Sequence, residues 1–115
     1  MREADGLALS SRNRYLSTID RTRALAIPRS LSEAARSFDD GERSVAALRA
    51  LVLAPLEDAL DRVDYVTIAD ADDVGVLADD VTVDDRAVLA VAARVGTTRL
   101  IDNLVLGEDP APLQP

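Results

Sequence analysis

A short basic loop near the N-terminus carries the residue types best suited to chemistry in this chain. Ser10, Ser11 and Arg12 follow a glycine-containing segment, and residues 5–16 break any helical period. The first 23 residues hold five arginines against three acidic residues, a local charge of +2, whereas the other 92 residues carry −10. The planar guanidinium of Arg12, the two hydroxyls and nearby backbone N–H groups suit a phosphate-like anion. A solvated loop that precedes a helix is the alternative interpretation.

The residue types that the chain lacks exclude several kinds of active site. The 115-residue sequence contains no cysteine, histidine, lysine or tryptophan. Histidine-based triads, thiolate nucleophiles, cysteine-ligated zinc or iron–sulfur sites and lysine Schiff bases are therefore ruled out. Arginine, carboxylates, hydroxyls and backbone amides remain for chemistry.

The net charge of −8 bears on the choice of partner. It argues against nucleic acid and anionic membranes, but it leaves room for a small anion at a locally basic position. The longest apolar run, residues 87–93, is far too short to cross a membrane, and the N-terminus has no apolar signal-peptide core. We therefore expect a cytoplasmic protein with no nucleic-acid or membrane partner.

Seven aspartates lie between Asp70 and Asp85, so a calcium site has to be considered. An EF-hand loop places oxygen ligands at alternate positions, and from Asp70 the pattern reaches Val74 and fails. We interpret the stretch as a solvated loop and expect no metal site. Arg99 and Asp102 lie three positions apart in an otherwise apolar strand, on opposite faces, so each is expected to anchor a neighbouring loop.

Periodicity predicts helical segments followed by three strands. Ser17 suits the N-cap of the first helix, with Asp20 three residues on. Pro28 and Pro55 lie inside the helical patterns and favour a break, and Pro55 is expected to start a short final helix. The expected ranges are helices at 17–38 and 42–62, strands at 63–69, 87–95 and 99–106, and a disordered tail at 107–115. This order predicts an α+β fold with the helices packed on one face of a small, about three-stranded antiparallel sheet.

Three runs of sequence, taken together, resemble one family. The runs are READGLALSSRNRYL at 2–16, VDYVTIAD at 63–70 and AARVGTTRLIDN at 92–103. Their order and spacing are similar to the C-terminal domain of the pantothenate synthetase (pantoate–β-alanine ligase) family, over residues 1–106. The first run is the most specific of the three.

The resemblance implies ATP-dependent amide synthesis. In this family pantoate attacks the α-phosphate of Mg-ATP to give pantoyl adenylate and pyrophosphate, and β-alanine then displaces AMP. The resemblance also implies an N-terminal Rossmann-like domain as partner, which holds the catalytic histidines, the pantoate pocket and most of the ATP and magnesium contacts. The parent is expected to be a homodimer through that domain, and the present chain a monomer.

The resemblance assigns roles to the basic loop. Leu9, Ser10, Ser11 and Arg12 correspond to the KMSKS-like segment of adenylating enzymes. The backbone at Leu9 is expected to face adenine, where the family often has methionine, and the next three residues to face the triphosphate. Arg12 is the expected catalytic residue, stabilising charge on the α-phosphate and the leaving pyrophosphate.

Met1 stands where the family continues upstream, so we expect an excised lid domain that is inactive alone and covers ATP in its parent. A stand-alone, non-enzymatic α+β interaction module, whose similarity is inherited but unused, is the alternative.

Overall fold

The computed structural model describes residues 2–72 and 75–113, so Met1 and Val74, both named above, lie outside the described residues. Within these described residues, seven elements follow one another. They are a 3-10 helix η1 (Ser11–Tyr15), helices α1 (Thr18–Ala24), α2 (Ala26–Asp39) and α3 (Val45–Ala59), and strands β1 (Arg62–Asp70), β2 (Ala87–Val95) and β3 (Thr98–Leu106).

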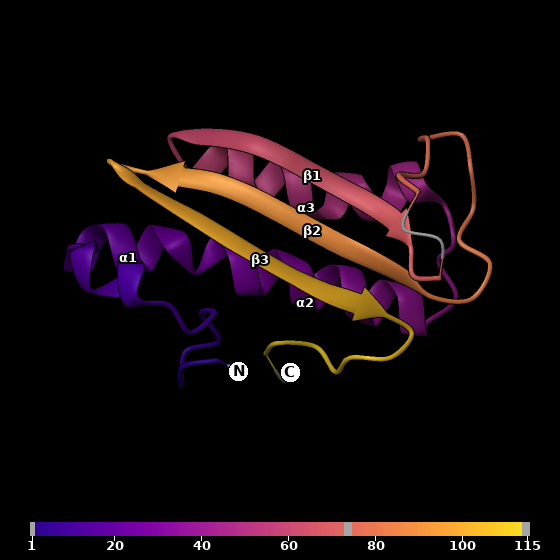
Figure 1. The fold of residues 1–115 in the computed structure, drawn as a ribbon, viewed down its shortest axis with the longest axis horizontal. Helices are drawn as coiled ribbons and strands as arrows, with labels where there is room; N and C mark the ends of the chain where they lie inside the picture. Colours follow the sequence, from indigo (N-terminus) through magenta and orange to yellow (C-terminus); the bar gives the residue numbers. More distant parts are fainter. Residues whose placement is uncertain (1, 73–74, 114–115) are drawn as a thin grey trace.

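The three strands form an antiparallel sheet in the order β1-β2-β3. Helices α2 and α3 lie behind this sheet in Figure 1, with α3 against β1 and α2 against β3. The α+β fold with helices on one face of a three-stranded antiparallel sheet is therefore confirmed. Strand β2 is central and almost wholly apolar because both of its neighbours are strands and its inner face meets the helices.

One apolar core fills the space between the helices and the sheet. Its side chains are aliphatic with a single aromatic ring, as the composition requires. The largest fully buried side chains come from α2, α3 and all three strands: Ile27, Leu31, Leu48, Leu56, Ile68, Leu89, Leu104 and Leu106. The helices thus hold the sheet by burial of apolar surface, and the N-terminal loop lies at the β3 edge of this core.

The break predicted in the first helical segment is present. Ser17 caps α1 by accepting the Asp20 N–H at 3.0 Å, and the helix ends at Ala24. A new helix begins at Ala26, with Pro28 in its first turn, where a missing N–H costs nothing. The break precedes the proline by three residues because the ring crowds the carbonyl four positions earlier, that of Ala24.

The interruption predicted at Pro55 is wrong. Helix α3 runs without a break through Pro55 to Ala59, and no separate final helix forms. A proline in mid-helix removes one hydrogen bond, here to the carbonyl of Leu51, a residue that is 36 % exposed on the solvent side. The buried residues Leu48, Val52 and Leu56 hold the helix together across that gap.

Within the expected disordered tail, Leu113 packs against α2, whereas residues 107–110 are exposed to solvent. The N–H of Leu113 donates to Ser32 Oγ at 2.8 Å, and Arg36 donates to the Leu113 carbonyl at 3.0 Å. Leu113 also covers Gly6, whose φ of +91° only glycine adopts easily. The three prolines and the charges at 108–109 predict disorder from composition. The contacts depend mostly on one apolar residue, Leu113, which composition does not single out. Residues 114 and 115 lie outside the described part.

The aspartate-rich loop between β1 and β2 is tied to the start of α3. The N–H of Val83 donates to the Arg43 carbonyl at 2.8 Å, and the N–H of Val45 donates to the Val81 carbonyl. Within residues 2–72 and 75–113, acidic side chains form no metal-binding cluster. No helix in that same part combines the length and apolar character that a membrane crossing requires.

Substitution of the two strained glycines should separate backbone strain from close contact. Gly41→Ala, with φ of +114° and open space around it, should cost about 1 kcal/mol of unfolding free energy. Gly6→Ala should cost roughly 1–3 kcal/mol more, because its Cβ would lie 2.6 Å from Leu113 Cδ2.

Urea unfolding of both variants, and of each combined with Leu113→Ala, measures these costs. Leu113→Ala should recover much of the loss in Gly6→Ala and none in Gly41→Ala. Equal losses in the two glycine variants would show that the tail does not rest on Gly6.

Candidate functional site

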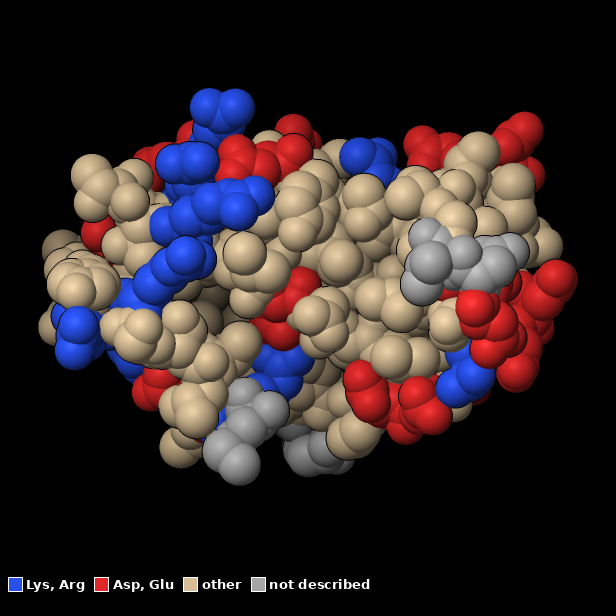
Figure 2. All heavy atoms as spheres, in the orientation of Figure 1, with Lys and Arg blue, Asp and Glu red and all other residues tan. Residues whose placement is uncertain are grey.

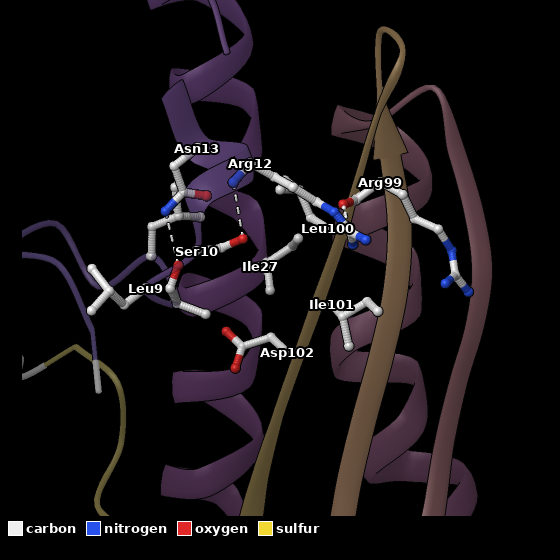
Figure 3. Close-up of a pocket in the computed structure, with 11 residues that line it drawn as sticks. Leu9, Ser10, Arg12, Asn13, Ile27, Arg99, Leu100, Ile101 and Asp102 are labelled. Carbon is white, nitrogen blue, oxygen red and sulfur yellow. Dashed lines mark hydrogen bonds between the residues drawn. The ribbon is translucent and has the colours of Figure 1, made fainter. Parts of the chain in front are cut away.

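A pocket of about 200 Å³ lies between the N-terminal loop and β3. Residues 7–10 with Arg12 and Asn13 form one wall, residues 99–102 of β3 form the other, and Ile27 of α2 contributes apolar surface. Figure 3 shows Arg12 reaching from the loop toward the backbone of Arg99 on β3. The sequence-predicted loop therefore faces a strand end and forms a concave surface with it.

The loop is fixed to β3 by an ion pair between Arg2 and Asp102. The two Nη groups of Arg2 donate to the two carboxylate oxygens of Asp102 at 2.6 and 2.9 Å. Arg2 also donates to the Gly6 carbonyl at 3.0 Å. Asp102 is only 7 % exposed, so it needs this counterion. The expectation that Asp102 anchors a loop is confirmed, and Arg2 is the partner that spacing alone could not identify.

The same loop is held to α1 by Arg21. Arg21 Nε donates to Asp5 at 3.0 Å, and its Nη2 donates to Glu3 at 2.8 Å. Hydrogen bonds from Arg21 lower the pKa of both carboxyl groups, and Asn13 adds to the effect on the pKa of Glu3. Both acids are therefore ionised at neutral pH and serve as anchors.

Local hydrogen bonds shape the segment that carries Arg12. Ser10 caps η1, because its hydroxyl accepts the Arg12 N–H at 3.1 Å. The Asn13 side-chain amide donates to the Ala8 carbonyl at 2.9 Å and to the Glu3 carboxylate. The Oδ1 atom of Asn13 is the only buried side-chain polar atom among the described residues that has no hydrogen-bond partner. An acceptor thus lies at the pocket wall with its bonding capacity unused.

Arg12 differs from Arg2, Arg21 and Arg23 of the same N-terminal region, and it lines the pocket, which Arg14 does not. Arg2, Arg21 and Arg23 each pair with carboxylates, whereas Arg12 has no ion pair among the described residues. Its guanidinium makes a long hydrogen bond of 3.5 Å, from Nη1 to the Arg99 carbonyl. The guanidinium of Arg12 is therefore exposed, with its charge available to bind an anion.

The structure brings together most of the predicted site residues. Leu9, Ser10 and Arg12 line the pocket, and Ser11 is exposed beside it in η1. Sequence reasoning missed η1 itself and the wall residue Asn13. A Ser10–Asn13 pair three residues apart is a capping signal that could have indicated the short helix.

The pocket residues fit an anion better than a cation. Asp102 is the single carboxylate of the lining, and Arg2 already binds both of its oxygens. Magnesium requires several free oxygen ligands, and the lining offers the Asn13 Oδ1 and the Ser10 hydroxyl but no free carboxylate, so these residues do not fit it. The hydroxyl of Ser10 and the guanidinium of Arg12 are donors suited to phosphate oxygens.

Comparison with known proteins gives one consistent result. A family model described as pantoate–β-alanine ligase matches residues 1–105. The chain is 47 % identical over 110 residues to a pantothenate synthetase of Citrifermentans bemidjiense and 49 % identical over 110 residues to that of Geobacter sulfurreducens. Each alignment covers 95 % of this chain and 38 % of the relative, so the chain spans about two fifths of the relatives' length.

A solved structure shares the fold. The crystal structure of pantothenate synthetase from Thermus thermophilus superposes with a TM-score of 0.76 at 37 % identity. The match covers 90 % of this chain and 37 % of that one.

Acid should weaken the anchoring of the loop by Arg21. Because the folded pKa values of Glu3 and Asp5 lie below the ordinary 4.5 and 3.8, their contribution to stability is complete above those values. It is lost as pH falls through the lowered folded values. The difference in unfolding free energy between the native chain and Arg21→Gln should thus be largest near neutral pH and shrink below about pH 4.

Urea midpoints measured from pH 7 to pH 3 for both proteins test this dependence. A difference that stays constant over the whole range would show that Arg21 acts on the loop through packing and not through the two carboxylates.

Proposed function

Because the chain belongs to the pantoate–β-alanine ligase family, we propose that it is the C-terminal lid domain of such a ligase. In the whole enzyme, a pantoate carboxylate oxygen attacks the α-phosphorus of ATP and pyrophosphate leaves. The amine of β-alanine then attacks the acyl carbon, and AMP leaves as pantothenate forms. The partner of this chain is an N-terminal Rossmann-like domain of the same cytoplasmic, homodimeric protein, and that domain supplies the remaining catalytic groups and the magnesium contacts.

The exposed guanidinium of Arg12, which has no carboxylate partner among the described residues, is the observation that carries the proposal. Arg2, Arg21 and Arg23 pair with carboxylates, and Arg14 lies over the Tyr15 ring and does not line the pocket, so Arg12 presents an uncompensated cation there. The loop that bears it is held on two sides, by β3 through Arg2 and by α1 through Arg21. A cation held in place in this way stabilises developing negative charge with little reorganisation.

Each loop residue takes a role that its position allows. The Ser10 hydroxyl accepts from the Arg12 N–H and keeps its own proton to donate to a phosphate oxygen. The Ser11 hydroxyl is exposed beside it and does the same. Leu9, 59 % exposed, presents its backbone and an apolar side chain toward adenine. Arg12 binds the α-phosphate and the leaving pyrophosphate, so it is the catalytic residue of this segment.

The domain makes a second contribution to catalysis by closing over bound ATP. The cover excludes water from the acyl adenylate, which water would otherwise hydrolyse. The domain alone is inactive because the pantoate site and the remaining transition-state contacts belong to the partner domain.

Substitution of Arg12 tests the role of the loop. In the intact ligase polypeptide that carries this chain, Arg12→Ala should lower the rate of pantoyl adenylate formation by about 10²–10³-fold. The measurement is ATP–pyrophosphate exchange with pantoate present. The matched control is Arg29→Ala, which removes an exposed arginine on α2 outside this pocket and should leave the rate within about twofold. Turnover near normal in Arg12→Ala would remove the catalytic role.

The domain assignment has its own test. Mass spectrometry of the native protein should find peptides that continue upstream across position 1. Peptides that begin only at Met1 would instead favour a free-standing interaction module.

A further inference from the structure

Three arginines stand side by side across the end of the sheet. Arg62 on β1 is the register partner of Arg94 on β2, and Arg94 is the register partner of Arg99 on β3. Like charges directly opposite one another on neighbouring strands are destabilising. Figure 2 shows arginine side chains as a blue stripe across one end of this face. We name Arg62, Arg94 and Arg99 the arginine row.

One carboxylate lies at the centre of the arginine row. Asp64 receives Arg99 Nε at 2.9 Å and Arg94 Nε at 3.4 Å, and its other oxygen lies 3.0 Å from Arg62 Nε. The three cations hold the pKa of Asp64 below its usual value, first through the hydrogen bond from Arg99. Three positive charges against one negative charge leave the group at +2.

The unused donors of the arginine row are its terminal nitrogens. All three side chains contact Asp64 through Nε, and no hydrogen bond from their Nη groups is found within the described residues. Other nearby acids are already engaged, since Asp20 and Asp61 both pair with Arg23. The row therefore offers several N–H donors and two uncompensated charges to solvent, a pattern that suits an anion with many oxygens.

A hollow connects the arginine row to the loop. It has a volume of about 340 Å³ and is lined by Arg12, Tyr15, Thr97, Thr98 and Arg99. The two threonine hydroxyls and the Arg12 guanidinium thus extend the row, and the charge of the whole group rises to +3. Small oligophosphates combine the required negative charge with many acceptor oxygens. A single carboxylate has only two oxygens and would accept hydrogen bonds from only one guanidinium group.

We propose that the arginine row is a binding site for inorganic oligophosphate, of which pyrophosphate is the smallest member. The row adjoins the pocket of Ser10 and Arg12, because Arg99 also lines that pocket, whereas Arg62 and Arg94 lie outside it. Transfer of the leaving pyrophosphate from Arg12 to the arginine row would rest on the proposed function. Binding of free pyrophosphate to the row does not depend on it.

The test is a titration of the 115-residue chain with inorganic pyrophosphate, observed by NMR at the arginine Nε–H and backbone resonances. Saturable shifts should appear at Arg62, Arg94 and Arg99, and the Kd should weaken as NaCl is raised. Arg94→Gln, which removes the central cation, should weaken binding at least about fivefold. Its matched control is Arg86→Gln, which removes the same charge from an arginine paired with Asp72 and Glu108 and should change the Kd by less than about twofold.

Two further variants keep the result decisive. Arg62→Gln, at a side chain 72 % exposed, replaces Arg94→Gln if that variant fails to show the native circular dichroism spectrum. Arg12→Gln separates the two proposals, because its adenylation defect is measured in the intact ligase and binding to the row is measured in the 115-residue chain. Saturable binding that depends on Arg94 supports the row whatever the outcome for Arg12.

Absence of shifts at the arginine row, or equal binding by Arg94→Gln and Arg86→Gln, overturns the proposal. If a poly-glutamate peptide saturates the row and pyrophosphate does not, the row is a protein contact and the oligophosphate site is likewise overturned.

Discussion

The placement of the candidate site depends on one interaction, the ion pair of Arg2 with Asp102. A carboxylate in the wall of an apolar core is costly unless a counterion satisfies both oxygens, and Arg2 does so with two short hydrogen bonds. The bond joins residues 100 positions apart in the chain, so it fixes the first residues to the last strand. The pocket exists because the loop that follows Arg2 is then held against the β3 edge.

The arginines of this protein fall into two groups: those that pair with carboxylates and those whose charge stays exposed to solvent. With a net charge of −8, most arginines have carboxylates near enough to neutralise them, and Arg2, Arg21 and Arg23 are used in that way. Arg12 and Arg14 in the loop have no carboxylate partner among the described residues, and of the two Arg12 lines the pocket. An exposed, unpaired arginine on an acidic protein creates a local positive field that attracts small anions. The rest of the surface stays negative and does not attract polyanions such as nucleic acid. Charge placement, more than charge content, therefore sets the class of ligand.

Elements whose signal is local were predictable from the sequence. The apolar run 87–93 is long enough to define most of β2, and the break near Pro28 follows from the geometry of proline. Features that depend on tertiary contacts were not. Burial on one side kept α3 continuous through Pro55, and Leu113 docks only because Gly6 leaves room for it. At the site, the suitability of Ser10 and Arg12 for binding an anion could be predicted from the sequence. The position of Asn13 in the pocket wall and the pairing of Arg2 with Asp102 are visible only in the folded structure.

Strand β3 links the two surfaces through its alternation. Side chains of successive residues point to opposite faces, so Arg99 and Asp102, an odd number of positions apart, must serve different sides. Asp102 turns inward and receives Arg2, whereas Arg99 turns outward to Asp64, and its carbonyl receives Arg12. One short strand segment thus supports the pocket with one side chain, the arginine row with another, and the contact between them with its backbone. A shift of register by one residue would exchange these faces and disrupt all three contacts together.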